Sequence, residues 1–166
     1  TVVDCTSKGA LMGERLSLHD GAIDRAELIE RAVAALRDGR MIIAPIEHAY
    51  VFVGDAFNHA VVKKIHILRQ DPRGTAAQVI IGDISTAKGI TLEFGPTINS
   101  LCEKFWPGLL TVNIPPARGL VWDLGDERTL EEIALRIPAS DFLRDVATAT
   151  GPLAIASASL AGRPAT

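Results

Sequence analysis

The segment F-W-P-G-L-L-T, from Phe105 to Thr111, decides how the middle of this 166-residue chain is interpreted. It closes a helix that we expect to begin at Pro96, because proline is favoured in the first turn of a helix. Pro107-Gly108 then breaks that helix. The apolar run Leu109–Ile114 is typical of a buried strand. The segment therefore predicts a helix, a sharp turn and a strand in close succession.

Helix-like and strand-like segments alternate on both sides of this segment. Capping residues and apolar periodicity predict helices from Asp24 to Gly39, from Asn58 to just before Pro72, and from Ser140 to about Ala149. Short apolar runs predict strands at Met41–Ala44, Tyr50–Val53, Gln78–Ile81, Ile133–Ile137 and Leu153–Ala156. Pro115–Arg128, rich in turn residues, is the least ordered-looking stretch. We expect a single α/β (α+β) domain over residues 1–166, with a twisted mixed sheet.

Composition excludes some classes of function. The formal net charge is −3, which argues against a strongly basic nucleic-acid binder. A local cluster of Lys63, Lys64, Arg69 and Arg73 is either a basic patch or a solvated helix face followed by a loop. No apolar run reaches about 18 residues, so we expect no membrane span and a cytoplasmic protein.

The cysteines and histidines give no sign of a metal site. Cys5 and Cys102 are far apart in sequence, and we expect two idle or buried thiols rather than a disulfide. None of the four histidines has a zinc-ligand spacing, so no metal is expected to be bound by the protein.

Three segments at strand ends are candidates for chemistry, because open α/β sheets bind ligands there. They are Pro45–Tyr50, Arg69–Arg73 and Ser157–Gly162. The Glu47-His48 pair in the first is either catalytic or a structural turn. The serine-rich third segment could hold phosphate through hydroxyls and backbone N–H groups.

Taken in order, these segments resemble the YrdC-like family of threonylcarbamoyl-adenylate synthases. P-I-E-H-A-Y-V-F-V-G-D-A from Pro45 is similar to the family's P-T-E-T-V-Y-G-L-G-A-D-A, and the helix ending L-R-Q-D-P at Pro72 is similar to one ending K-G-R-P. F-W-P-G-L-L-T is close to F-W-P-G-P-L-T. Arg136-Ile137-Pro138 matches R-x-P, and S-A-S-L-A-G-R-P-A-T from Ser157 matches S-A-N-L-S-G-x-P-S-T.

The resemblance implies a twisted α/β sheet around a large concave, cationic cavity. Active members are nucleotidyltransferases that use threonine, bicarbonate and ATP, and their product serves tRNA modification. It implies ATP with Mg²⁺ as the requirement of an active chain, and threonine as a second ligand. RNA binding and a homodimer are further expectations that the resemblance leaves open.

The family's site residues carry over with changes. Arg69 stands at the lysine of K-G-R and is the expected catalytic cation. The expected substrate- or nucleotide-binding residues are Glu47, His48, Tyr50, Arg73, Arg136, Ser157 and Ser159. Asp71 replaces the family's arginine, and it would repel a phosphate. Ile46 and His48 replace the two threonines of P-T-E-T, and Ser159 replaces the asparagine of S-A-N.

The first residues suggest a rearrangement. T-V-V-D-C-T (Thr1–Thr6) and Gly21–Ile23 resemble the family's closing S-T-V-V-D-x-T … G-A-I. Either the last strand has moved to the front, or a short valine-rich strand matches by chance. A relocated strand should pair into the same sheet.

These residues support three hypotheses. The first is a nucleotide-, anion- or RNA-binding protein of the family with a degenerate catalytic site, motivated by Asp71 and the lost threonines. The second is an active threonylcarbamoyl-adenylate synthase in which Arg69, Arg73 and Arg136 share the phosphate contacts. The third is a non-catalytic interaction subunit whose cleft is empty, which a cavity filled by the side chains of Ile46, Val51 and Phe52 would favour.

Overall fold

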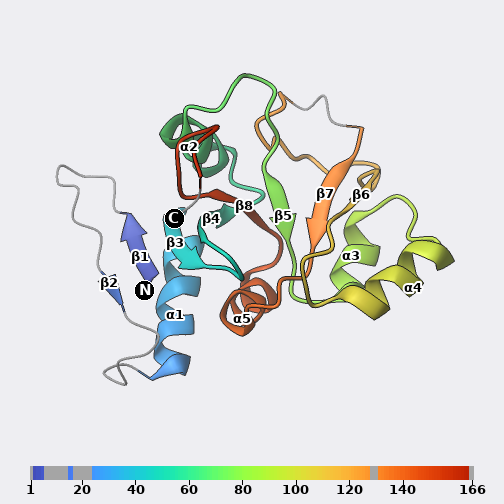
Figure 1. The fold of residues 1–166 in the computed structure, drawn as a ribbon, viewed down its shortest axis with the longest axis horizontal. Coiled ribbons are helices and arrows are strands. Elements are labelled where there is room, and N and C mark those ends of the chain that lie inside the picture. Colours follow the sequence, from blue (N-terminus) through green and yellow to red (C-terminus); the bar gives the residue numbers. More distant parts are fainter. Residues whose placement is uncertain (1, 6–14, 17–23, 128–130, 165–166) are drawn as a thin grey trace.

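The computed structural model describes residues 2–5, 15–16, 24–127 and 131–164. Its strands are β1 (Val2–Cys5), β2 (Arg15–Leu16), β3 (Met41–Pro45), β4 (Tyr50–Asp55), β5 (Gln78–Ile80), β6 (Val112–Ile114), β7 (Ile133–Arg136) and β8 (Leu153–Ser157). They form one sheet in the order β2-β1-β3-β4-β8-β5-β7-β6 (Figure 1). β5 and β7 pair in parallel and the other neighbouring pairs are antiparallel, so the predicted mixed α/β sheet is confirmed.

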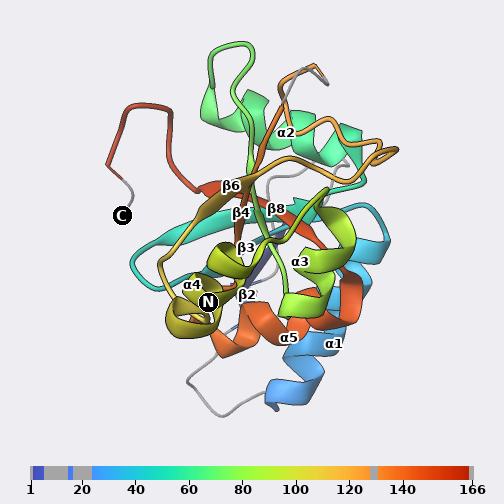
Figure 2. The same cartoon turned by 90° about the vertical axis from the view of Figure 1, so that its right-hand side faces the viewer.

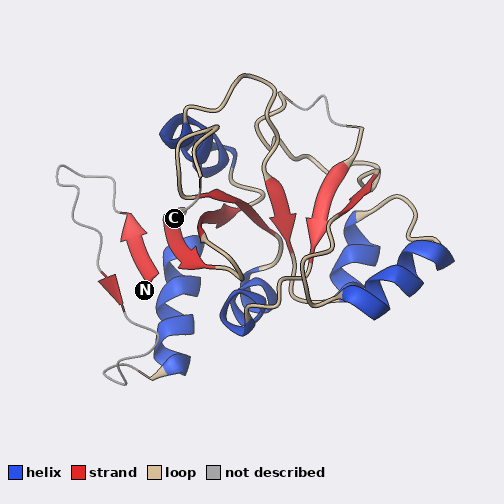
Figure 3. Cartoon of the chain, in the orientation of Figure 1, coloured by secondary structure: helices blue, strands red, loops and turns tan. Residues whose placement is uncertain are grey.

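The helices are α1 (Arg25–Arg37), α2 (His59–Arg69), α3 (Ile84–Ile90), α4 (Pro96–Phe105) and α5 (Asp141–Thr150). Figure 2 places α1 and α5 together on one side of β3, β4 and β8, with α2 on the other side. The secondary-structure view shows α3 and α4 gathered beside β6 and β7 (Figure 3). Helices therefore cover both faces of the sheet.

Apolar side chains explain this arrangement. On one face, Leu36 of α1 and Leu143 of α5 are buried with Val53 and Ile155 of the sheet. Burying side chains of this size contributes about 1.5–3 kcal/mol each. On the other face, Ile65 of α2 is buried with strand residues of the central sheet. The apolar side chains whose spacing predicted α1 and α2 are the ones that pack these helices against the sheet.

Helix starts follow capping chemistry. The Asn58 side chain accepts a hydrogen bond from Val61 N at 3.2 Å, and Ser140 caps α5. At the other end of α2, Gln70 adopts a left-handed conformation with φ +57°. That conformation favours glycine, and the family motif K-G-R-P has glycine at this place.

Besides shifts of a few residues at element ends, two features differ from the sequence-based expectations. Helix α3 was missed. Asp83 caps it, because its Oδ1 accepts from Thr86 N at 2.8 Å, and the helix packs buried Ala87 and partly buried Ile84 and Ile90 against the core. The segment expected to be least ordered, described here through Glu127, has little regular structure but is packed, with Trp122 and Leu124 buried. Irregular backbone and ordered packing are compatible because apolar side chains anchor the loop.

The first strand pairs as expected. β1 runs antiparallel to β3, with Val3 opposite Ile43 and Cys5 opposite Met41. The prediction that these residues join the same sheet is confirmed. Thr1, Thr6 and Gly21–Ile23, the other parts of that comparison, lie outside the described residues.

Candidate functional site

A cleft of about 260 Å³ gathers residues from all three predicted loops. His48 comes from the β3–β4 turn, Arg69 from the end of α2, and Ser157 from the end of β8. Arg136, the last residue of β7, also lines it. Because β7 and β8 end here, the cleft lies where strand ends were expected to place a ligand site.

Arg69, the expected catalytic cation, is engaged by acceptors of the protein itself. Its Nε donates to Asp71 Oδ2 at 2.9 Å and to Oδ1 at 3.2 Å. Its Nη1 donates to the carbonyl oxygens of Ser157 and, at 3.0 Å, of Ser159. The guanidinium therefore ties the end of α2 to the loop after β8.

Asp71 also contacts a third side chain, His66. The distance from His66 Nδ1 to Asp71 Oδ2 is 2.8 Å, and the Asp71 side chain is only 2% exposed. Burial raises the pKa of this carboxyl, but hydrogen bonds and charge from Arg69 and His66 outweigh it, so its pKa is lowered overall. Asp71 is thus an ionised carboxylate held between two basic side chains.

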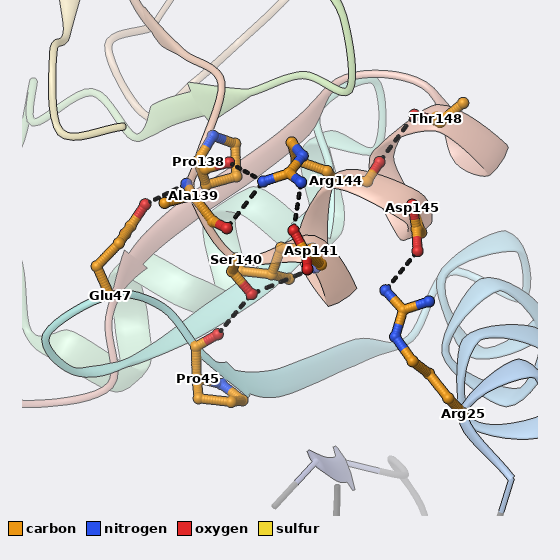
Figure 4. Close-up of polar contacts among 11 residues, drawn as sticks. Arg25, Pro45, Glu47, Pro138, Ala139, Ser140, Asp141, Arg144, Asp145 and Thr148 are labelled. Atoms are coloured by element: carbon orange, nitrogen blue, oxygen red, sulfur yellow. Dashed lines mark hydrogen bonds and ion pairs between the residues drawn. The ribbon is translucent and has the colours of Figure 1, made fainter. Parts of the chain in front are cut away.

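Glu47 and Arg136 form a second pair of opposite charges. Arg136 Nη1 lies 3.5 Å from Glu47 Oε2, and Arg136 is buried. Glu47 Oε1 accepts from Ala139 N at 2.5 Å, which joins the β3–β4 turn to the loop before α5 (Figure 4). Within the described residues, Arg136 Nε is buried without a hydrogen-bond partner. Its guanidinium is therefore only partly satisfied.

Glu47 and the remaining expected residues are not among those that line the cleft. Tyr50 is 38% exposed at the start of β4. Ser159 contributes its carbonyl to Arg69, and its hydroxyl lies 3.5 Å from Arg163 O. Arg73 is exposed on the loop after α2. Asp55, which stands at the aspartate of the motif that begins at Pro45, accepts from Phe57 N at 2.9 Å, a turn contact.

Some cleft residues were not predicted as functional. His66 and Gln78 line the cleft, and so does Ile155. His66 lies three residues before Arg69 and therefore on the same side of α2. This spacing was the one sequence signal that could have placed His66 in the cleft with Arg69. Gln78 opens β5, where sequence gives only strand propensity.

The apolar part of the cleft does not fill it. Ile46 and Val51 are buried in its wall. Phe52 packs instead with Met41, Val61 and Ile65, under α2. The filled cavity expected for an interaction subunit is not found.

Further observations concern metals, thiols and membranes. The described residues contain no group of three or more His, Cys, Asp or Glu side chains able to hold a metal ion. Cys102 is free and buried, and burial raises the pKa of its thiol. In the parts of the chain that are described, no helix is both long and apolar enough to cross a membrane.

The fold and the cleft define an α/β domain of the YrdC type, and comparison with known proteins names the family. The model of the Sua5/YciO/YrdC family, described as telomere recombination, matches residues 34–166, so the chain belongs to this family.

Relatives support the same assignment. A Mycobacterium leprae relative is 33% identical over 141 residues, which are 85% of this chain and 63% of the relative. A Bacillus subtilis relative named threonylcarbamoyl-AMP synthase is 31% identical over 137 residues, 82% of this chain and 39% of that protein. The chain therefore spans less than two thirds of these curated relatives.

The solved structures agree on the fold. The crystal structure of P. abyssi Sua5 complexed with L-threonine superimposes with a TM-score of 0.77 and 24% sequence identity. The likeness covers 86% of this chain and 42% of that one.

Proposed function

We propose that this chain is a small-anion-binding member of the Sua5/YciO/YrdC family whose catalytic site is degenerate. The observation that carries this proposal is the commitment of Arg69 to Asp71. A synthase must neutralise a triphosphate as pyrophosphate leaves, and this requires cations that are free to turn toward the phosphates. Here Nε of Arg69 contacts both carboxylate oxygens of Asp71.

The charge balance of the cleft supports this reading. Its two guanidinium groups, Arg69 and Arg136, each contact a carboxylate, from Asp71 and Glu47 respectively. These four charges cancel, and the further cation that the lining gains when His66 is protonated is itself in contact with Asp71. Few cations of the cleft are therefore free to meet a polyanion. Moving Arg69 onto a phosphate would leave the carboxylate of Asp71 buried and without that partner, which is unfavourable.

The size of the cleft favours a small ligand. Its volume of about 260 Å³ is below the range of roughly 300–1,000 Å³ that is typical of pockets for drug-sized molecules. Arg136 keeps an unpartnered Nε and a contact of 3.5 Å with Glu47 that is long for a hydrogen bond. A carboxylate-sized anion would complete its coordination, with His48 and Ser157 beside it. L-threonine, the ligand named in the P. abyssi Sua5 complex, is a suitable probe.

The second candidate is an active threonylcarbamoyl-adenylate synthase, in keeping with the name of the B. subtilis relative. In that case the protein would use ATP with Mg²⁺ and act in the cytoplasm on the route to modified tRNA. The contacts of Arg69 argue against this candidate.

One pair of measurements separates the two candidates. The full chain is assayed for pyrophosphate release with ATP, Mg²⁺, bicarbonate and L-threonine, with an active synthase as positive control. Calorimetry then measures binding of ATP and of L-threonine separately. We expect no pyrophosphate above background, no ATP binding at millimolar concentration, and measurable L-threonine binding. Synthesis at the rate of the control would overturn the proposal.

Matched variants locate the ligand. Arg136→Gln should weaken L-threonine binding at least about tenfold, as expected for loss of a charge-assisted contact. Arg73→Gln changes an exposed arginine outside the cleft and should leave the affinity unchanged. Ser157→Ala tests the same site without removing a buried charge. Equal effects of the Arg136 and Arg73 variants would place the ligand elsewhere.

A further inference from the structure

His66 lies between the cleft and a second cavity, and each of its ring nitrogens faces an oxygen. Nδ1 is 2.8 Å from Asp71 Oδ2, and Nε2 is 2.7 Å from the carbonyl oxygen of Leu124. The second cavity, of about 340 Å³, lies between α2 and the segment from Val121 to Glu127, called here the 121–127 loop. His66 lines both cavities.

The two oxygens require two protons on the ring. A carbonyl oxygen only accepts, so Nε2 must donate to Leu124. Asp71 accepts from Arg69 as well, and its lowered pKa keeps it ionised and therefore acceptor-only. Nδ1 must then donate too. Both contacts are made together only by the imidazolium form of His66.

The loop is fitted closely to this ring. The Leu124 carbonyl also accepts from Ala77 N at 2.7 Å. A Cβ built on Gly125 would lie 2.2 Å from His66 Nε2, so a larger residue could not approach as closely. Trp122, two residues before Leu124, packs edge-on against the ring of Phe57, with 5.3 Å between the ring centroids. Gain or loss of the proton on Nε2 therefore changes a direct contact with the backbone of the loop.

The charged surroundings of His66 are mixed. On the cleft side it shares the cavity lining with His48, Arg69, Asp71 and Arg136. On the loop side it shares the lining with His59, Lys63, Asp123 and Glu127. Among these groups Asp71 is the one in direct contact with the ring. It is therefore the charged group whose contact depends directly on a proton at Nδ1.

We infer that His66 is a proton-dependent latch that joins the 121–127 loop to the Asp71–Arg69 pair. With two protons, it donates to both Leu124 and Asp71. Loss of one proton leaves a ring lone pair facing one of the two oxygens at 2.7–2.8 Å, which is repulsive. The 121–127 loop then shifts away from the ring, and its link to the Asp71–Arg69 pair is broken. Proton uptake at one side chain thus couples the loop to the cleft, whichever ligand the cleft binds.

Nuclear magnetic resonance tests the latch in the full chain. The protonation of both ring nitrogens of His66 is followed through its titration by their ¹⁵N resonances, assigned by their loss in His66→Gln. The indole N–H resonance of Trp122 reports the loop. We expect both nitrogens to carry protons on the acid side, and the Trp122 resonance to move as the second proton leaves. The latch is refuted if the Trp122 resonance stays constant while His66 titrates.

Two variants decide which group operates the loop. His59 lies 3.3 Å from Val121 O on the same loop, so His59→Gln is a matched control and should leave the Trp122 transition in place. Asp71→Asn removes the carboxylate that accepts from Nδ1 of the ring, so the Trp122 transition should be displaced or lost. If His66→Gln does not fold, Asp71→Asn and His59→Gln in the wild-type background still decide. An unshifted transition in Asp71→Asn would overturn the assignment.

Discussion

Removing the charge of Asp71 should destabilise the fold measurably. In Asp71→Asn, the basic side chains of Arg69 and His66 lose a shared counter-charge while being 16% and 13% exposed. Removing one partner of a fully buried ion pair costs about 3–5 kcal/mol. Partial exposure, and the carbonyl acceptors that remain for Arg69 and His66, reduce this to about 2–3 kcal/mol. For a chain of this length the corresponding fall in Tm is about 4–12 °C.

The assay is urea unfolding at neutral pH, followed by fluorescence and circular dichroism. The matched control is Glu27→Gln, which breaks a pair with Arg31 at the same 2.8 Å separation, but with side chains 49% and 44% exposed. That substitution should cost less than about 1 kcal/mol. If both variants lose stability equally, burial is not what makes the Asp71 contacts strong, and the reasoning behind the proposed function fails with it.

Three further predictions test the same region. The pKa of Asp71 lies below its ordinary value of 3.8, so its contribution to the free energy of unfolding is complete above that pH and is lost as pH falls through the folded-state pKa. The difference in unfolding free energy between wild type and Asp71→Asn should therefore shrink when unfolding is measured at successively lower pH. Gly125→Ala should lower the free energy of unfolding by about 2 kcal/mol or more, because φ is +106° and the added Cβ meets His66 and Thr75. The control Gly119→Ala, at φ +84° with no atom within 4 Å of the added Cβ, should lower it by about 1 kcal/mol in the same assay. Gln70→Gly should raise the unfolding free energy by up to about 1 kcal/mol by relieving a left-handed conformation, and an unchanged or lower value would contradict this.

Much of the fold could be predicted because its elements carry local signals. Asn58 and Ser140 cap the helices that the sequence places after them. The strand after Pro107-Gly108 forms as β6, although it begins at Val112 rather than Leu109. Helix α3 escaped prediction because it spans only seven residues, in which Ala87 is buried and Ile84 and Ile90 are partly buried against the same core. So short an apolar period is hard to tell from a turn. Local capping by Asp83 was the remaining signal, and it is common in turns as well.

The candidate site was predicted as a set of loops, but not as a set of contacts. Strand ends explain why His48, Arg136 and Ser157 meet. The contact between His66 and Leu124 joins residues 58 positions apart and involves a backbone carbonyl, which no side-chain pattern reveals. Glu47 likewise reaches the backbone N–H of Ala139, 92 positions away. Contacts to the backbone depend on the path of the chain, and the sequence motifs do not encode that path.

Asp71 shows how a charge change can act differently from what its sign suggests. From the sequence, aspartate in place of the family's arginine predicts direct repulsion of a phosphate. In the structure its carboxylate also binds Arg69 and His66, so that Arg69 is not free to contact a phosphate. Deleting the carboxylate would not release that cation, because Arg69 Nη1 still donates to the carbonyls of Ser157 and Ser159. Replacing Asp71 by arginine would therefore not be enough to restore a phosphate site. The hydrogen bonds from Arg69 to the carbonyls of Ser157 and Ser159 would also have to break.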